Sequence, residues 1–255
     1  MRVSLDTSTV NVANLFLQAG NFVLPATPPA VAGTFNVTGG LGLFSDLDFV
    51  TYANFNVPFD TTFSWAGDFQ VGDFTGGFNL FVDAVGSITT GDIEGNEVNL
   101  FAGGSVTTGA ITASETIDLN SAGSTTTGAL TAGDGVIVEA IGAVNVASAS
   151  AGIVDPSSST GAEFVVAIRS LASITAGDLS AKGSVGVGSA GNITVGNITT
   201  GSLGLGFLAL AGTGLTTGSI DSSASLNGGR TYLANSSMEA LGGQIGDDFD
   251  PAPIL

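Results

Sequence analysis

Several residue types are scarce in this chain, and each shortage removes a class of function. The 255 residues include no cysteine, which excludes disulfides, thiol chemistry and cysteine-ligated metals. Histidine is absent too, so the commonest catalytic base and metal ligand is missing. Four basic residues oppose 22 acidic ones, for a formal charge of −18. Such a chain has no electrostatic footprint for nucleic acid or anionic lipid.

Long hydrophobic runs are also lacking, although the chain is apolar on average. Mean hydropathy is +0.47, yet no stretch approaches the ~20 apolar residues that a transmembrane helix needs. We therefore expect no membrane span in this chain. Apolar residues alternate finely with small polar ones, which is typical of β-strands around a substantial core rather than of disorder.

What the sequence has in abundance is a repeated octet of the form Gly-Ser-Ile-Thr-Thr-Gly-Asp-Ile. Its first apolar position falls at Phe69, Ile88, Val106, Thr125, Val144, Ile174, Ile193 and Leu215. Most steps between these positions lie within one residue of 19. The longest step contains Pro156 within a Ser/Gly-rich run, so we expect a loop insertion at 150–163.

Each repeat has room for three short strands separated by glycine or serine corners. The first strand centres on the Ile of Ser-Ile-Thr and the second on the Ile of Asp-Ile. The third alternates strictly, as in Val98-Asn-Leu100, which places its apolar side chains on one face. At the corners, glycine suits a backbone that must bend, often with a positive φ.

One coil cannot bury its own inward-facing side chains, so the repeat predicts a stack. Stacking at the ~4.8 Å strand spacing places Ile88 over Val106 and Ile93 over Ile111. The predicted fold is all-β: a right-handed parallel β-solenoid with about 19 residues and three short strands per coil. Thr125 falls in the first apolar column, where its hydroxyl would need a hydrogen-bond partner.

Three segments are expected along the chain. Residues 67–235 carry the solenoid repeats. Residues 1–66 are Phe-rich, and they either continue the stack as less regular coils or form a separate small β cap. Residues 236–255 are expected to be an extended C-terminal tail, and we expect both chain ends to be cuts within a longer protein.

The octet, the coil length and the Gly/Ala/Thr/Asn bias resemble the repeat regions of filamentous-haemagglutinin-like and autotransporter adhesins of bacteria, over about residues 67–235. The resemblance implies a secreted, elongated protein on the bacterial cell surface, exported through an outer-membrane transporter. Its partner would be a host or abiotic surface, with glycans as further candidates. Because the repeat motif is structural, no catalytic or binding residue carries over. We expect a rigid rod or repetitive adhesion surface, with no enzymatic activity, cofactor or metal.

A carbohydrate- or ice-binding face is an alternative. If Ile88 points inward, its two neighbours point outward, and the same holds in the following coils. This candidate face consists of Ser87, Thr89, Ser105, Thr107, Ser124 and Thr126. Threonine also simply suits an outward strand position, because β-branched residues favour strands.

Carboxylates offer the remaining candidates. A polysaccharide-active β-helix enzyme needs clustered carboxylates. Loose clusters comprise Asp155, Glu163, Arg169 and Lys182 around the insertion, and Asp46, Asp48 and Asp60 in the N-terminal part. Asp92, Asp178 and Asp221 recur at an outward position of the second strand, where we expect solvated side chains rather than a calcium ladder. The glycine-rich runs at 39–42 and 186–188 are not followed by a helix pattern, which argues against nucleotide loops.

Overall fold

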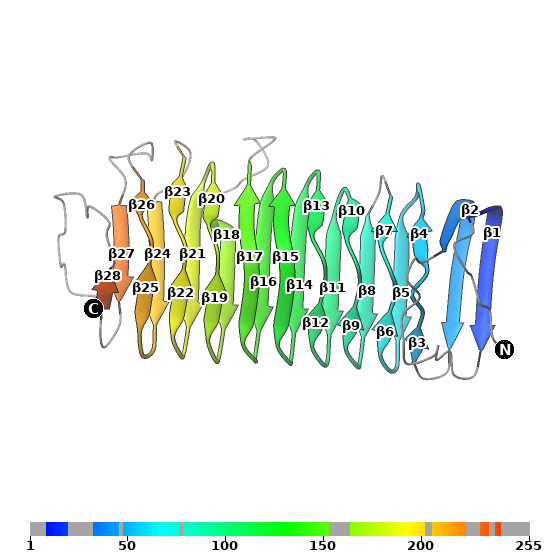
Figure 1. Cartoon of the computed structure of the whole chain (residues 1–255), viewed down its shortest axis with the longest axis horizontal. Helices are drawn as coiled ribbons and strands as arrows, with labels where there is room; N and C mark the ends of the chain where they lie inside the picture. The colour runs from blue at the N-terminus through cyan, green and yellow to red at the C-terminus, as the bar shows by residue number, and fades with distance from the viewer. Residues whose placement is uncertain are drawn as a thin grey trace.

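The structure, a computed structural model, describes residues 9–19, 33–45, 48–76, 79–152, 164–201, 206–222, 230–234 and 238–240. These residues form strands and turns but no helix, and their strands pair in parallel. Figure 1 shows one elongated stack of coils, with the N-terminal strands at one end and the C-terminal strands at the other. The predicted all-β parallel β-solenoid is confirmed. Within the described ranges, no helix is long and apolar enough to cross a membrane.

The strands lie in two sheets. Sheet A holds the first and second strands of each coil, and sheet B holds the third. First strands are β3 (Phe49–Val50), β6 (Phe69–Gln70), β9 (Ile88–Thr89), β12 (Val106–Thr107), β19 (Ile174–Ala176), β22 (Ile193–Val195), β25 (Leu215–Thr217) and β28 (Met238–Ala240). Second strands are β4 (Asn54–Asn56), β7 (Phe74–Thr75), β10 (Ile93–Gly95), β13 (Ile111–Ala113), β20 (Leu179–Ala181), β23 (Ile198–Thr200) and β26 (Ile220–Asp221).

Two coils merge the first and second strands into one, namely β15 (Thr125–Ala132) and β17 (Val144–Ala151). At the N-terminal end of sheet A lie two long strands, β1 (Thr9–Ala19) and β2 (Thr34–Ser45). Sheet B consists of β5 (Thr61–Trp65), β8 (Leu80–Ala84), β11 (Val98–Ala102), β14 (Thr116–Ser121), β16 (Gly135–Ala140), β18 (Phe164–Ser170), β21 (Ser184–Ser189), β24 (Gly206–Ala211) and β27 (Arg230–Ala234). Most coils therefore have the three strands that the repeat predicts.

The apolar columns follow the register read from the sequence. Ile88 pairs with Val106, Val106 with Thr125, and Thr125 with Val144, and all four are fully buried. In the second column Ile93 pairs with Ile111. Every coil thus buries its apolar side chains against the next coil, which supplies the burial that one coil alone lacks.

Thr125 satisfies its hydroxyl inside the core. Its Oγ1 lies 2.9 Å from the Oγ of Ser121, and Ser121 Oγ donates to the carbonyl oxygen of Gly123 at 3.1 Å. The same third-strand position holds Ser170 and Ser189, which donate to the carbonyls of Gly142 and Ala172, each at 2.8 Å. Buried serines therefore close the corner after several third strands, and they offset the burial of polar atoms.

The aromatic N-terminal part belongs to the same stack. Phe49 pairs with Phe69, and Phe55 pairs with both Phe35 and Phe74. The Phe49 and Phe69 rings stack with their centroids 5.9 Å apart, and those of Phe35 and Phe55 lie 5.6 Å apart. Phenylalanine thus fills the columns that isoleucine and valine fill in later coils.

Two segment limits differ from the sequence analysis. The insertion expected at 150–163 begins later, because Ser150 and Ala151 still pair with Ser180 and Ala181. Residues 153–163 lie outside the described ranges. At the other end, β28 pairs with β25 although it falls within 236–255, so the stack continues past residue 235.

The corner glycines serve close approach between coils rather than left-handed backbone, which corrects the expectation from sequence. Among the described glycines, Gly206 has a positive φ (116°), and it opens β24. A Cβ added to Gly91 or Gly109 would overlap the Oδ1 of Asp73 or Asp92 in the preceding coil. Glycine recurs there because a side-chain oxygen of the neighbouring coil occupies the space.

The column assignment predicts a large local cost for Ile111→Asp. Ile111 is fully buried between Ile93 and Leu130, so the substitution would bury an unpaired carboxylate and cost about 3–5 kcal/mol. The damage should begin locally, since coils contact only their neighbours. We expect limited proteolysis to cut first within 104–123. Thr112→Asp, at the next and exposed position, is the control and should leave the cleavage pattern unchanged.

Candidate functional site

The predicted hydroxyl-bearing residues lie at the first strand of three successive coils. Thr89, Thr107 and Thr126 are paired in one outward column of sheet A. Thr107 and Thr126 are exposed, whereas Thr89 is half-buried. The column continues through Asn145, Thr175 and Thr194, so the degenerate coil interrupts the threonines with an asparagine.

Two of the three serines of the predicted face, Ser87 and Ser105, form hydrogen bonds within the protein. Ser87 Oγ accepts the backbone N–H of Ser105 at 3.2 Å, and Ser105 Oγ accepts that of Ser124 at 3.1 Å. Ser87 and Ser105 thus each hydrogen-bond to the next coil and are half-buried. Ser124, Thr107 and Thr126 are exposed.

A second column of hydroxyl-bearing side chains lies on sheet A, and it was not predicted from the sequence. It runs along the second strands through Thr112, Thr131, Ser150, Ser180 and Thr199, all of them exposed. Each follows the last apolar residue of the octet, so reading one residue further in each repeat would have found it. We call this column, together with Thr107, Thr126, Thr175 and Thr194, the hydroxyl face. Its second column is bounded by Glu94 and Asp221 and holds no charge between them.

The aspartates assigned to solvated positions have a structural role at the corners. Asp92 Oδ1 accepts the backbone N–H of Ala110 at 2.8 Å, and Asp178 Oδ1 accepts that of Asn197 at 2.7 Å. Asp48 and Asp60 accept the N–H groups of Asp68 and Asn79 in the same way, at 2.9 and 3.2 Å. These side chains cap the backbone of the following coil.

Asp221 does not share the position of Asp92 and Asp178. It follows Ile220 within β26 and pairs with Thr199, whereas the other two precede their strands. The expectation of one repeated position for all three is therefore wrong for Asp221. In the described ranges, no group of three or more acidic residues is placed to hold a metal ion.

The candidate enzyme residues are only partly described. Asp46, Asp155 and Glu163 lie outside the described ranges. Arg169 lies on β18, where its Nη1 bonds the Oε1 of Glu139 at 2.7 Å, a partner that the sequence analysis did not name. Lys182 stands at the corner after β20, and its aliphatic stem packs near Gly152. Glu139 lies on the adjacent strand and pairs with Arg169. The two residues are 30 positions apart in the sequence because of the insertion, so their pairing cannot be read from the 19-residue period.

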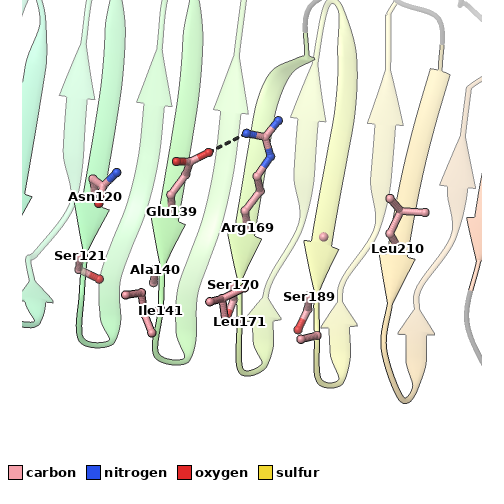
Figure 2. A pocket seen from close by; sticks show the side chains of 12 residues that line it. Asn120, Ser121, Glu139, Ala140, Ile141, Arg169, Ser170, Leu171, Ser189 and Leu210 are labelled. Atoms are coloured by element: carbon pink, nitrogen blue, oxygen red, sulfur yellow. Dashed lines mark hydrogen bonds and ion pairs between the residues drawn. The ribbon is translucent and has the colours of Figure 1, made fainter.

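The Arg169–Glu139 pair borders a shallow groove on the outer face of sheet B. The groove has a volume of about 570 Å³ and crosses β14, β16, β18, β21 and β24. Figure 2 shows its walls: Ile141 and Leu171 stand side by side at the corner, while Arg169 reaches toward Glu139 on the sheet face. The lining residues are Asn120, Ser121, Glu139, Ala140, Ile141, Arg169, Ser170, Leu171, Gly188, Ser189, Ala190 and Leu210.

Two carboxyl groups are perturbed. Partial burial raises the pKa of Asp118 above its ordinary value, and the Glu139 carboxylate raises it further. Burial also raises the pKa of Glu97, assisted by Glu115 and Asp60. Both shifts follow first from burial and then from neighbouring carboxylates along the stack.

The corner caps predict different outcomes for two acidic residues of one coil. Asp92→Ala removes the acceptor for Ala110 N–H and should cost about 1 kcal/mol in urea unfolding. Asp92→Asn keeps an Oδ1 acceptor and should stay close to the wild type. Glu94→Ala, an exposed position, matches the change in charge and should have little effect. Equal losses for Asp92→Ala and Glu94→Ala would contradict the cap.

Asp118→Asn should stabilise the protein at neutral pH. A carboxyl group whose pKa is raised in the folded state lowers stability as pH rises from the unfolded value, ordinarily 3.8, through the folded one. Asparagine removes this penalty, so the gain should be present at neutral pH and vanish below about pH 4. Thermal unfolding across pH measures it, with Asp83→Asn, an exposed acid on β8, as the control for lost charge.

Family membership rests on comparison with known proteins. No protein-family model matches the sequence, and neither a curated protein nor a solved structure matches it. The resemblance to filamentous-haemagglutinin-like adhesins is therefore supported only at the level of the β-solenoid repeat architecture.

Proposed function

We propose that this chain is a rod-like structural and adhesive segment of a secreted bacterial surface protein. The observation that carries the proposal is the continuity of the stack, in which parallel pairing links coil to coil from β1 to β28. About ten coils at the ~4.8 Å strand spacing give a rod on the order of 50 Å long.

The rod is held at its corners as well as in its sheets. Side-chain oxygens of Asp68, Asp73 and Asp92 each accept a backbone N–H of the following coil at 2.7–2.9 Å. Bending the stack would open these bonds together with the sheet ladders. Such a rod suits a spacer, and its repeated outer surfaces suit weak contacts made many times over.

Contacts of the ionisable groups favour this function over catalysis. Arg169 is paired with Glu139, and Asp48 and Asp60 each accept a backbone N–H. These groups act within the fold, in the part of the chain that the structure describes.

Deletion of whole coils tests the proposal. Removal of 105–123 or of 172–190 joins equivalent corner positions, so each shortened chain should fold and keep its register. Beads coated with either chain should adhere to cells and abiotic surfaces with a similar, modest loss, because a repetitive surface has no single essential coil. Removal of 105–113 alone breaks the register and should prevent folding.

Two results would contradict the proposal. Complete loss of adhesion on deleting one coil but not the other would indicate one localised site. Antibodies to the chain should also label intact producing cells, and labelling only after lysis would exclude a surface role.

The hydroxyl face favours a second candidate function, binding of ice or a crystalline polysaccharide. Its two columns repeat at the coil spacing on sheet A, and the residues that form them are uncharged. Retention on chitin or cellulose, or inhibition of ice growth, should then be lost in Thr126→Glu/Thr131→Glu. Thr62→Glu, on the outer face of sheet B, should retain it. A wild-type chain without either activity would remove this candidate.

A further inference from the structure

Exposed aliphatic side chains gather beside the groove on sheet B. Leu171 is 69% exposed, Ile141 57% and Leu210 46%. Figure 2 places all three around the groove, at the corner and on the sheet face. Single exposed apolar residues need no explanation, but a contiguous group around a hollow marks a contact surface.

Gly188 lines this groove, and the packing of the chain does not require a glycine at this position. It lies within β21, where glycine weakens a strand, yet a Cβ added there would meet nothing within 4 Å. The corner glycines Gly91 and Gly109 differ, because a neighbouring coil fills their space. A strand glycine with open space above it suits close approach by another molecule.

The corner row along sheet B reads almost the same in both directions. Each residue directly follows the third strand of its coil, and its N–H bonds the preceding coil. In order, its six central members are Gly103, Ala122, Ile141, Leu171, Ala190 and Gly212. Val85 precedes Gly103 in the same row and is 70% exposed, and the position that would mirror it lies outside the described residues. The centre of the row lies between Ile141 and Leu171, and among the six members equal distances from that centre hold residues of equal size.

A second row, on the sheet face, is arranged about the same centre. Here the two central residues have opposite charges, Glu139 on one side and Arg169 on the other. In paired order its six central members are Phe101, Asn120, Glu139, Arg169, Gly188 and Leu210, and Asp83 and Ala234 continue the row beyond them. Among these six positions, Gly188 mirrors the small polar Asn120, and the apolar Leu210 mirrors Phe101. Both rows have their centres between β16 and β18.

We propose that a second copy of this chain docks on this face, with its stack antiparallel to the first. The two-fold axis lies between β16 and β18 and runs along the strands. It places Glu139 against Arg169 of the second copy, Ile141 against Leu171 and Leu210 against Phe101. The space above Gly188 receives Asn120. A two-fold interface requires such self-complementarity, because the same patch serves both partners.

The charges fit this partner better than another molecule. Each chain carries a formal −18, which opposes association over most of its surface. Among the six central positions of each row, Glu139 and Arg169 cancel, so these positions carry no net charge. Asp118 and Asp83 lie on the same sheet face, but the two-fold axis sets them opposite Gly186 and Ala234 and not opposite an acid. The Glu139 and Arg169 side chains keep 38% and 63% exposure within one copy, and the Arg169 guanidinium retains N–H groups for a second carboxylate. The symmetry axis then joins four alternating charges.

Charge reversal followed by mixing tests the interface. The wild-type chain should sediment as a dimer at tens of micromolar. Glu139→Arg and Arg169→Glu each set like charges across the axis and should weaken dimerisation at least about tenfold. An equimolar mixture of the two variants should form a heterodimer, because every contact across the axis is then opposite in charge. Glu94→Arg, on sheet A, is the control and should leave the dimer unchanged.

Cysteine cross-linking provides an independent measurement. The chain has no native cysteine, so an introduced cysteine is the sole thiol of its chain and can form a disulfide only with another chain. Ile141→Cys mixed with Leu171→Cys should give a disulfide-linked dimer on mild oxidation, and Thr112→Cys mixed with Thr131→Cys on sheet A should not. A monomeric wild-type chain, single reversals that still dimerise, or a mixture that stays monomeric would each overturn the proposal.

Discussion

Parallel register between successive coils is the constraint on which the rest of this structure depends. A coil of about 19 residues has too few apolar side chains to form a core alone, so its stability resides in the contacts above and below. Ile111 is buried only because Ile93 and Leu130 lie in the adjacent layers. A slip of one residue would turn that column to solvent, so the register between Ile93, Ile111 and Leu130 must be kept.

The corners hold the register where the sheets end. Asp73 and Asp92 each accept a backbone N–H of the next coil, and the glycine beside that N–H leaves room for the carboxylate. The Gly-Asp pair of the octet is thus a unit that acts across two coils. It also gives part of the acidic excess a structural role: a carboxylate can accept this bond and still expose its other oxygen to water.

Period and alternation were enough to predict the columns, because burial of Ile88, Val106 and Val144 is encoded within each repeat. The partner of Thr125 was not predictable, since Ser121 belongs to the third strand and approaches only when the corner closes. The Asp92 cap was missed for a related reason: its acceptor role depends on a backbone group 18 residues away. Glu139 was missed because the insertion hides its pairing with Arg169 in the sequence.

The same register determines which residues lie next to one another on the surface. A repeat protein can therefore have a symmetric face although no segment of its sequence is symmetric. Residues at equivalent positions of consecutive coils form a row, so the order of side chains along the row is set by substitutions many residues apart. On sheet A the outward rows hold threonine or serine in most coils, with Asn145 as an exception. A row that repeats is the same under translation, which suits a periodic polymer or lattice. On sheet B the six central positions of the rows through Ile141 and Glu139 reverse about a centre. A reversing row with opposite charges at its centre is complementary to itself after rotation, and not to a periodic polymer. The two sheets therefore differ in the symmetry of what they can recognise, although one stacking rule builds both.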